Sequence, residues 1–272
     1  MDFIRVELHG EDSQVKEILI ARLTEMGYLG FEETDDVLIA YISVSEFDHI
    51  ALKGIAGTSL MSIAPVKEEN WNAVWESNFE PVVIEDFCTI RAEFHEIEVR
   101  TLYDIIITPK MSFGTGHHST TRSVILLMSK ISFINKRVMD FGTGTGILAI
   151  LSSKLGASKV VAIDNDEWSF RNATENVSNN QCLNVEVSLT DLNEYWNDHF
   201  DVVLANINKN VLINYSNTLS HLVNNNGYLI LSGILDIDES DIVTCFSGLG
   251  FEVNEIVTDS CWMAILLKKN VD

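Results

Sequence analysis

Basic side chains are scarce in this sequence of 272 residues: 18 lysines and arginines stand against 40 aspartates and glutamates, a formal net charge of −22. Residues 1–110 hold 22 acidic and 8 basic side chains, so most of the excess lies in less than half of the length. Such a charge disfavours binding to nucleic-acid phosphates and favours a basic protein partner. Because solubility alone also accounts for an acidic surface, charge by itself does not identify the partner.

Long apolar runs and paired cysteines are missing as well. No stretch approaches the roughly 18 apolar residues of a membrane helix, and residues 1–13 are acidic where a signal peptide needs a basic end. The four cysteines are widely spaced, which indicates neither a zinc site nor a disulfide framework: Cys88, Cys182, Cys245 and Cys261. We expect a cytoplasmic protein that holds no metal and contacts neither membrane nor nucleic acid, and we expect a monomer.

The periodicity of apolar residues predicts two domains joined by a short helix. Residues 1–66 follow a βαββαβ pattern, which is typical of a ferredoxin-like α+β domain. Residues 67–81 form the predicted linker helix, which Pro81 ends. Residues 82–272 begin with short strands and continue as a second, α/β domain.

Helices and strands alternate in this second domain from Ser119 onward. The predicted strands are 137–141, 159–164, 184–189, 201–206, 227–232, 251–258 and 261–268. The predicted helices are 119–130, one that starts near Gly146 and ends at Leu155, 167–180, 209–223 and 236–247. Strands that alternate with helices indicate a Rossmann-like, mostly parallel seven-stranded sheet, here with an antiparallel hairpin at one edge.

The most informative motif is Arg137-Val-Met-Asp-Phe-Gly-Thr-Gly-Thr-Gly146. It predicts a strand, a glycine turn and the start of a helix, and a second strand stops at Asp164. Gly142 and Gly144 have no Cβ atoms to keep a ligand from the backbone, and the following helix presents free N–H groups. The spacing therefore predicts a nucleoside cofactor site.

The residues favour S-adenosylmethionine over a dinucleotide as that cofactor. A dinucleotide turn needs a small sixth residue, and Ile147 occupies that position. Asp140 would repel a pyrophosphate but attract an ammonium and a sulfonium, while Asp164 could accept from both ribose hydroxyls. The alternative is that Asp140 only caps the turn and Asp164 only ends a strand. We favour a class I methyltransferase.

Three further segments extend the pattern. Met111-Ser-Phe-Gly-Thr-Gly-His-His-Ser-Thr-Thr121 is a glycine turn followed by hydroxyl residues that can cap a helix, and Ala205-Asn206-Ile207 ends the fourth strand. Trp71, Trp75 and Phe79-Glu-Pro81 lie in the predicted linker. Together with the glycine motif, the chain from about 70 to 265 closely resembles the bacterial methyltransferases of the large-subunit ribosomal protein L-eleven (L11), the PrmA family.

The resemblance implies a protein N-methyltransferase. Its first domain would recognise the ribosomal protein, and its second would bind S-adenosylmethionine and methylate an α-amine and lysine ε-amines. The implied cofactor contacts are Thr121, Gly142, Asp164 and Asn206, to which the residue patterns add Asp140 and Gly144. His118-Ser119 replaces the His-Pro of many members, a change that removes no ligand group.

Asn206 is the predicted catalytic residue. Amino methyltransferases that act on flat substrates usually continue this strand end with Pro-Pro-aromatic, whereas here Ile207-Asn208 follows. An aliphatic amine is therefore favoured, with Asn206 orienting the amine or the methionine moiety. His117 and His118 are candidate general bases, but a role in loop architecture is the stronger interpretation. The alternatives left open are another protein or small-molecule amine as substrate, and a non-catalytic adaptor.

Overall fold

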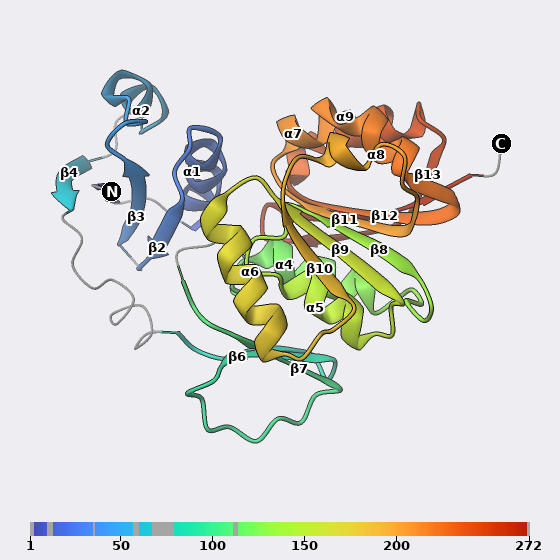
Figure 1. Cartoon of the computed structure of the whole chain (residues 1–272). Coiled ribbons are helices and arrows are strands. Elements are labelled where there is room, and N and C mark those ends of the chain that lie inside the picture. Colours follow the sequence, from blue (N-terminus) through green and yellow to red (C-terminus); the bar gives the residue numbers. More distant parts are fainter. Residues whose placement is uncertain are drawn as a thin grey trace. The chain divides into compact units, whose positions relative to one another are not determined.

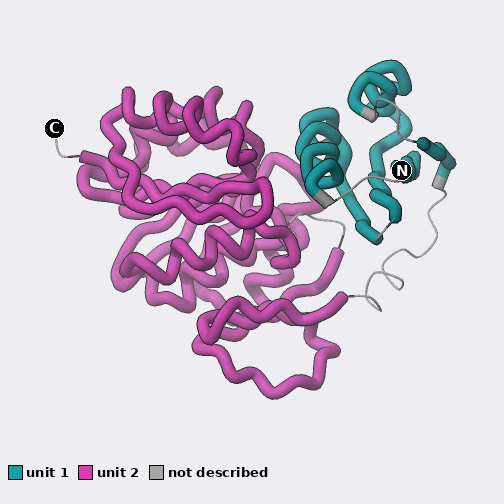
Figure 2. Tube along the Cα trace, turned by 180° about the vertical axis from the view of Figure 1, so that it is seen from behind, with its two compact units in different colours: residues 1–78 teal, residues 79–272 magenta. Residues whose placement is uncertain are grey.

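The computed structural model describes residues 3–9, 13–34, 36–56, 60–66, 79–110 and 114–270. They belong to two compact units, Met1–Asn78 and Phe79–Asp272, which are coloured separately in Figure 2. Most of the predicted linker helix, with Trp71 and Trp75, lies outside the described residues. Phe79 to Pro81 are described and are not helical, and the exact domain boundaries stay a prediction.

Unit 1 has an antiparallel sheet in the order β2-β3-β1-β4. Its elements are β1 (Phe3–His9), α1 (Ser13–Glu25), β2 (Gly30–Glu33), β3 (Val37–Ser43), α2 (His49–Ala56) and β4 (Leu60–Val66). Along β1, Val6 and Leu8 are buried in the core. Arg5, Glu7 and His9 form a polar row between them, because successive side chains of a strand point to opposite faces. The βαββαβ order is the ferredoxin-like order that the sequence predicted.

Unit 2 is built on a seven-stranded sheet in the order β10-β9-β8-β11-β12-β14-β13. Its strands are β8 (Arg137–Phe141), β9 (Lys159–Asp164), β10 (Val185–Leu189), β11 (Phe200–Asn206), β12 (Val223–Leu235), β13 (Phe251–Asp259) and β14 (Trp262–Lys269). Strands β8 to β12 are parallel where they pair, and β14 is antiparallel to both of its neighbours. This confirms the predicted Rossmann-like sheet with its edge hairpin.

Helices cover both faces of this sheet (Figure 1). One face packs against α4 (Ser119–Met128), α5 (Ile147–Lys154) and α6 (Glu167–Asn179), and the other against α7 (Lys209–Asn214), α8 (Ser216–Leu222) and α9 (Glu239–Ser247). The strands are apolar on both sides: Val138 of β8 belongs to the first layer and the adjacent Met139 to the second. Burial on both faces is why these strands read as continuous apolar runs in the sequence.

A smaller sheet precedes α4 and packs on the α4–α6 layer. It contains β5 (Val82–Ile84), β6 (Cys88–Ala92) and β7 (Tyr103–Ile107), in the order β5-β6-β7. Ile90, Ile105 and Ile107 are buried and carry the contact with the main core. In the part of the chain that the structure describes, β7 is an edge strand of this sheet.

Two predicted elements differ from the structure. The predicted helix 209–223 is two helices, because Tyr215 adopts a non-helical conformation between α7 and α8. Its hydroxyl donates to Asp191 and its ring packs edge-on against Phe141, so tertiary contacts override local helix propensity there. Strand β12 also begins before its predicted start, at Val223. Among the described residues, no helix is long and apolar enough to cross a membrane.

Candidate functional site

The predicted site residues meet at one end of the main sheet. Strands β9, β8 and β11 are neighbours and run in the same direction, so their carboxyl ends lie at the same edge. Asp140 is the penultimate residue of β8, Asp164 ends β9 and Asn206 ends β11. Ligands of parallel α/β sheets bind at this edge.

The glycine turn joins β8 to α5 through three residues with left-handed backbones. Gly142, Gly144 and Gly146 have φ values of 74°, 55° and 85°, which side chains disfavour. Gly146 is the N-cap of α5 and has no side chain to satisfy the first N–H groups of the helix. Asp140 takes the N–H of Ala149, which leaves those of Ile147 and Leu148 for a ligand at the sheet edge.

Close packing within the chain gives Gly142 a second reason to be glycine. A Cβ atom at Gly142 would lie 2.4 Å from Cγ2 of Ile207, which follows Asn206. Ligand approach, the reason that the sequence suggested, is thus not the only demand on this position. The side chain of Ile207 braces the turn at the end of the neighbouring strand.

Asp140 is buried beneath the turn, with 1% of its surface exposed. Its Oδ2 accepts hydrogen bonds from Thr143 Oγ1 at 2.6 Å and from the Ala149 N–H at 3.1 Å. Burial raises the pKa of this carboxyl to about 7. These contacts are those of a residue that holds the turn and the start of α5, the alternative that the sequence left open. Contact with a cofactor stays a prediction for Asp140.

Asp164 joins the second strand end to the turn. Its Oδ2 accepts from the Gly144 N–H at 2.9 Å, and its Oδ1 accepts from the Asp166 N–H at 3.0 Å. Burial raises its pKa, although the side chain stays partly exposed. Because each carboxylate oxygen can accept more than one hydrogen bond, Asp164 keeps capacity for a ligand.

Thr121 and Asn206 face each other across a small cavity of about 20 Å³, the room of a single water molecule. Nδ2 of Asn206 lies 3.4 Å from Oγ1 of Thr121. Oδ1 of Asn206 is buried and has no hydrogen-bond partner among the described residues. The cavity is lined by Gly114, Thr121, Gly142, Thr143, Thr145, Ile147, Leu148 and Asn206.

The sequence did not single out Thr143, Thr145 or Gly114. Thr145 donates its hydroxyl proton to the carbonyl of Gly114, so the turn after β8 touches the turn before α4. The alternation of threonine with glycine in both motifs was the available signal. Of the 111–121 motif, residues 111–113 lie outside the described part.

Both candidate histidines have structural contacts. Nδ1 of His118 accepts from the Thr120 N–H at 3.3 Å and caps α4, and its ring packs edge-on against Trp262. Burial lowers the pKa of His118 to about 4 and also lowers the pKa of His117, whose ring packs against Phe79. Burial thus favours the neutral form of both rings, and their packing agrees with a role in loop architecture.

Comparisons with known proteins cover most of the chain. A family model described as "Ribosomal protein L11 methyltransferase (PrmA)" matches residues 6–270. The chain belongs to this family. A relative of that name from Porphyromonas gingivalis is 37% identical over 260 residues, 92% of this chain and 89% of the relative. Another from Chlorobaculum tepidum is 35% identical over 271 residues, 94% of this chain and 93% of the relative.

A solved structure supports the same assignment. The crystal structure of a ribosomal protein L11 methylase from Lactobacillus delbrueckii subsp. bulgaricus aligns with a TM-score of 0.65 and 25% identity, over 71% of this chain and all of that chain. The PrmA-family chain is thus an S-adenosylmethionine-dependent methyltransferase with a class I fold, as the sequence predicted. The roles of the individual site residues remain predictions.

The residues at the sheet edge fit this cofactor. Asp164 can accept hydrogen bonds, the first turn of α5 offers N–H donors, and Oδ1 of Asn206 is a buried acceptor without a partner among the described residues. A cofactor with ribose hydroxyls, an ammonium and a carboxylate supplies the matching groups. The donor and acceptor set is therefore complementary to it.

Proposed function

We propose that the protein transfers methyl groups from S-adenosylmethionine to amines of ribosomal protein L11, at the α-amine and at lysine ε-amines. The observation that carries this proposal is the family match over residues 6–270 together with Thr121, Gly142 and Asn206 around one cavity. The strongly acidic chain, with a formal net charge of −22, is complementary to a basic protein substrate.

In this proposal the two carboxylates have different tasks. Asp164, partly exposed at the end of β9, accepts hydrogen bonds from the ribose hydroxyls. Asp140 stays beneath the turn and holds Thr143 and the N–H of Ala149, so that the N–H groups of α5 keep their direction. The cofactor supplies an electrophilic methyl group on a positively charged sulfur.

Asn206 is proposed to orient the attacking amine. Its Oδ1 is a buried acceptor, which suits a substrate N–H, and Thr121 lies within 3.4 Å of its Nδ2. An oriented amine can attack in line with its lone pair aligned, and alignment of reacting atoms lowers the barrier substantially. Ile207, which stands where a flat-substrate enzyme has proline, leaves the site shaped for an aliphatic chain.

The amine must be neutral to attack. Deprotonation at pH 7 costs about 4.6 kcal/mol for a lysine of pKa ~10.4 and about 1 kcal/mol for an α-amine near 7.8. Desolvation and a neighbouring positive sulfur both lower the pKa of an ammonium group, so water can take the proton. His118, with a pKa of about 4, is a weak base at this pH, which favours a mechanism without a dedicated histidine base.

Unit 1 is proposed to recognise the protein substrate. The support is its ferredoxin-like topology, in a unit separate from the methyltransferase unit, and its charge, since residues 1–78 hold 15 acidic and 5 basic side chains. A basic ribosomal protein is complementary to that charge.

The test is intact-mass analysis of purified L11 after incubation with the enzyme and S-adenosylmethionine. The proposal expects successive methyl increments on L11, which peptide mapping then assigns to the α-amine and lysines. The Asn206→Ala protein serves as the control for contaminating activity. L11 of unchanged mass, with an enzyme that binds the cofactor, would reject L11 as the substrate.

A further inference from the structure

Helix α6 presents a column of asparagines to the outer edge of β7. Asn172, Asn176 and Asn180 are spaced four residues apart, so they lie on one face of the helix and its C-cap. All three side chains bind backbone groups of residues 106–108. None of these three asparagines lines the cavity between Thr121 and Asn206.

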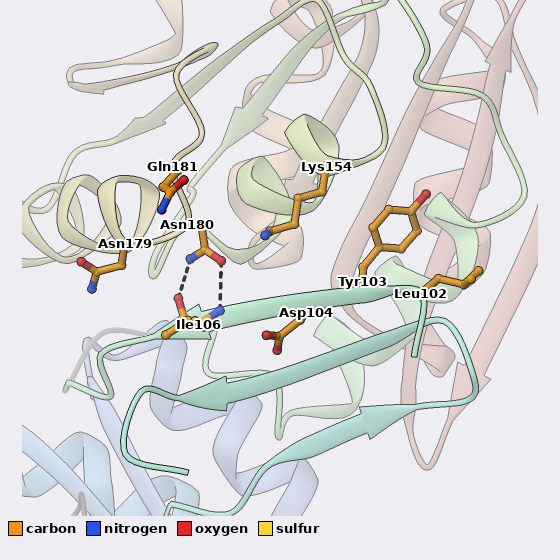
Figure 3. Close-up of a pocket in the computed structure, with 8 residues that line it drawn as sticks. All are labelled: Leu102, Tyr103, Asp104, Ile106, Lys154, Asn179, Asn180 and Gln181. Atoms are coloured by element: carbon orange, nitrogen blue, oxygen red, sulfur yellow. Dashed lines mark hydrogen bonds between the residues drawn. The ribbon is translucent and has the colours of Figure 1, made fainter. Parts of the chain in front are cut away.

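The side-chain amide of Asn180 binds β7 in the way that the backbone of a neighbouring strand would. Its Oδ1 accepts from the Ile106 N–H at 3.0 Å and its Nδ2 donates to the Ile106 carbonyl at 2.5 Å. Figure 3 shows both bonds between the end of α6 and β7, at the side of a groove of about 490 Å³. Residue 106 faces away from β6, since the N–H of Tyr103 bonds to Phe87 and directions alternate along a strand. Asn180 therefore satisfies an edge that no strand of the described residues covers.

The side-chain amide of Asn176 binds backbone groups of two separate segments. Its Oδ1 accepts from the Thr108 N–H at 2.8 Å, but its Nδ2 donates to the carbonyl of Thr145 at 2.8 Å. Thr145 lies in the glycine turn, and Asn176 is completely buried at 0% exposure. One amide group thus connects the end of β7 to the cofactor turn.

The carbonyl of Thr145 depends on such a donor. Gly146 is the N-cap of α5 and its carbonyl takes the first helical hydrogen bond, from Ile150. Thr145 precedes the N-cap, so its carbonyl lies outside the ladder of the helix. The N–H of Ala149, one turn along, is occupied by Asp140. A buried carbonyl without a hydrogen-bond donor destabilises the fold. Nδ2 of Asn176 can donate to the Thr145 carbonyl only while the turn keeps this geometry.

We propose that Asn176 is a positioning residue for cofactor binding: it fixes the direction of the Thr145 peptide, and with it the turn that presents the N–H groups of α5. The proposal rests on the assignment of the cofactor to this turn. The turn contains three glycines, so its shape depends on the groups that bind it from outside. Besides the backbone carbonyls of Ile163 and Gly114, these include the side chains of Asp140, Asp164 and Asn176.

The experiment compares two isosteric variants on the same helix face, Asn176→Asp and Asn180→Asp. Each keeps the acceptor for a backbone N–H, that of Thr108 or that of Ile106. Asn176→Asp loses the donor to the Thr145 carbonyl, and Asn180→Asp loses the donor to the carbonyls of Ile106 and Asn176. Calorimetry with S-adenosylhomocysteine on the folded full chain should give a Kd raised about tenfold for Asn176→Asp, the scale of a lost buried hydrogen bond, and within about twofold of wild type for Asn180→Asp. In steady-state kinetics, Asn176→Asp should have a raised KM for S-adenosylmethionine and an unchanged KM for the protein substrate.

Hydrogen exchange followed by mass spectrometry gives a readout independent of activity. Amides of residues 142–148 should exchange faster in Asn176→Asp than in Asn180→Asp. Equal cofactor affinity and equal exchange in the two variants would overturn the proposal and leave Asn176 with a structural role only. If an aspartate variant does not fold, the pair Asn176→Ser and Asn180→Ser is judged by the same criteria.

Asp164→Ala separates failure of this inference from failure of the cofactor assignment. If Asp164→Ala loses affinity while Asn176→Asp binds like Asn180→Asp, the cofactor site stands and the positioning role is wrong. If both bind like wild type, the assignment of the cofactor to this turn is wrong, and the positioning role is wrong with it.

Discussion

The carboxylates named at the two ends of the main sheet differ in their partners. At the amino end, acidic side chains pair with basic ones: Arg137 with Asp198 at 2.8 Å, and Lys159 with Glu186 at 2.9 Å. At the carboxyl end, Asp140 and Asp164 form no ion pair with another described residue. Burial raises the pKa of both carboxyls, and the charge of Asp164 raises that of Asp140 further.

The comparison identifies Asp140 and Asp164 as carboxylates that have no cationic partner among the described residues. Solvent-exposed ion pairs contribute at most about 1 kcal/mol each and need no ligand. Buried carboxylates without a cation are costly, and a positively charged ligand reduces that cost. The carboxyl end is thus complementary to a cofactor that brings an ammonium and a sulfonium.

The largest effect concerns stability and Asp140. Its pKa is about 7 in the folded protein and near 3.9 when unfolded, so the folded state favours the protonated form. Its contribution is fully present below about pH 4 and is lost as the pH rises to about 7, on the order of 4 kcal/mol in total. Denaturant titrations of wild type and Asp140→Asn from pH 4 to 8 should show a pH-dependent loss that the variant lacks. Parallel curves for the two proteins would show that Asp140 does not titrate in this range.

Asn206→Ala should lower the methyl-transfer step about a hundredfold, because a misplaced amine or methionine group loses alignment. Single-turnover assays with saturating cofactor measure this step separately from binding. A full rate in this variant would remove Asn206 from the catalytic residues.

Asp164→Ala should weaken cofactor binding about tenfold or more, since charge-assisted hydrogen bonds of ~1.5 to 3 kcal/mol are lost. Asp164→Asn should be milder because one acceptor survives. Calorimetry on the folded variants gives both affinities. Wild-type affinity in Asp164→Ala would place the cofactor elsewhere.

His117→Ala and His118→Ala should each keep most of the single-turnover rate and the wild-type pH profile, because burial favours the neutral form of both rings and both are engaged in packing. A loss beyond about a hundredfold, in a variant that melts like wild type, would indicate general-base catalysis instead.

The smallest effect is expected at the amino end of the sheet. Asp198→Asn removes an exposed ion pair with Arg137 and should change the free energy of unfolding by less than about 1 kcal/mol. Cofactor affinity should stay within twofold of wild type. A tenfold change in the Kd would erase the distinction between the two ends.

Local sequence patterns predicted the elements that carry the cofactor site. Strands β8 and β9 have the predicted limits, because apolar runs bounded by a glycine turn and by an aspartate leave little choice. The break between α7 and α8 could not be predicted, since Tyr215 is held by contacts with Asp191 and Phe141 from elsewhere in the chain.

The bridge made by Asn176 was missed for a related reason. Asparagines four residues apart were visible in the sequence, but the carbonyl of Thr145 and the N–H of Thr108 are partners that only the fold brings near. Asp140 was recognised as a site residue, but its buried position beneath the turn required the structure.

The packing of Ile207 against Gly142 and Gly233 restricts which residues can occupy these two positions in the family. A Cβ atom at Gly142 would meet the side chain of Ile207, whereas one at Gly233 would lie 2.4 Å from its carbonyl oxygen. A smaller residue at 207 would relieve the side-chain contact at position 142 but not its left-handed backbone, with φ of 74°, and would leave the contact at 233 unchanged. Homologues should therefore keep glycine at both 142 and 233, whatever side chain position 207 carries.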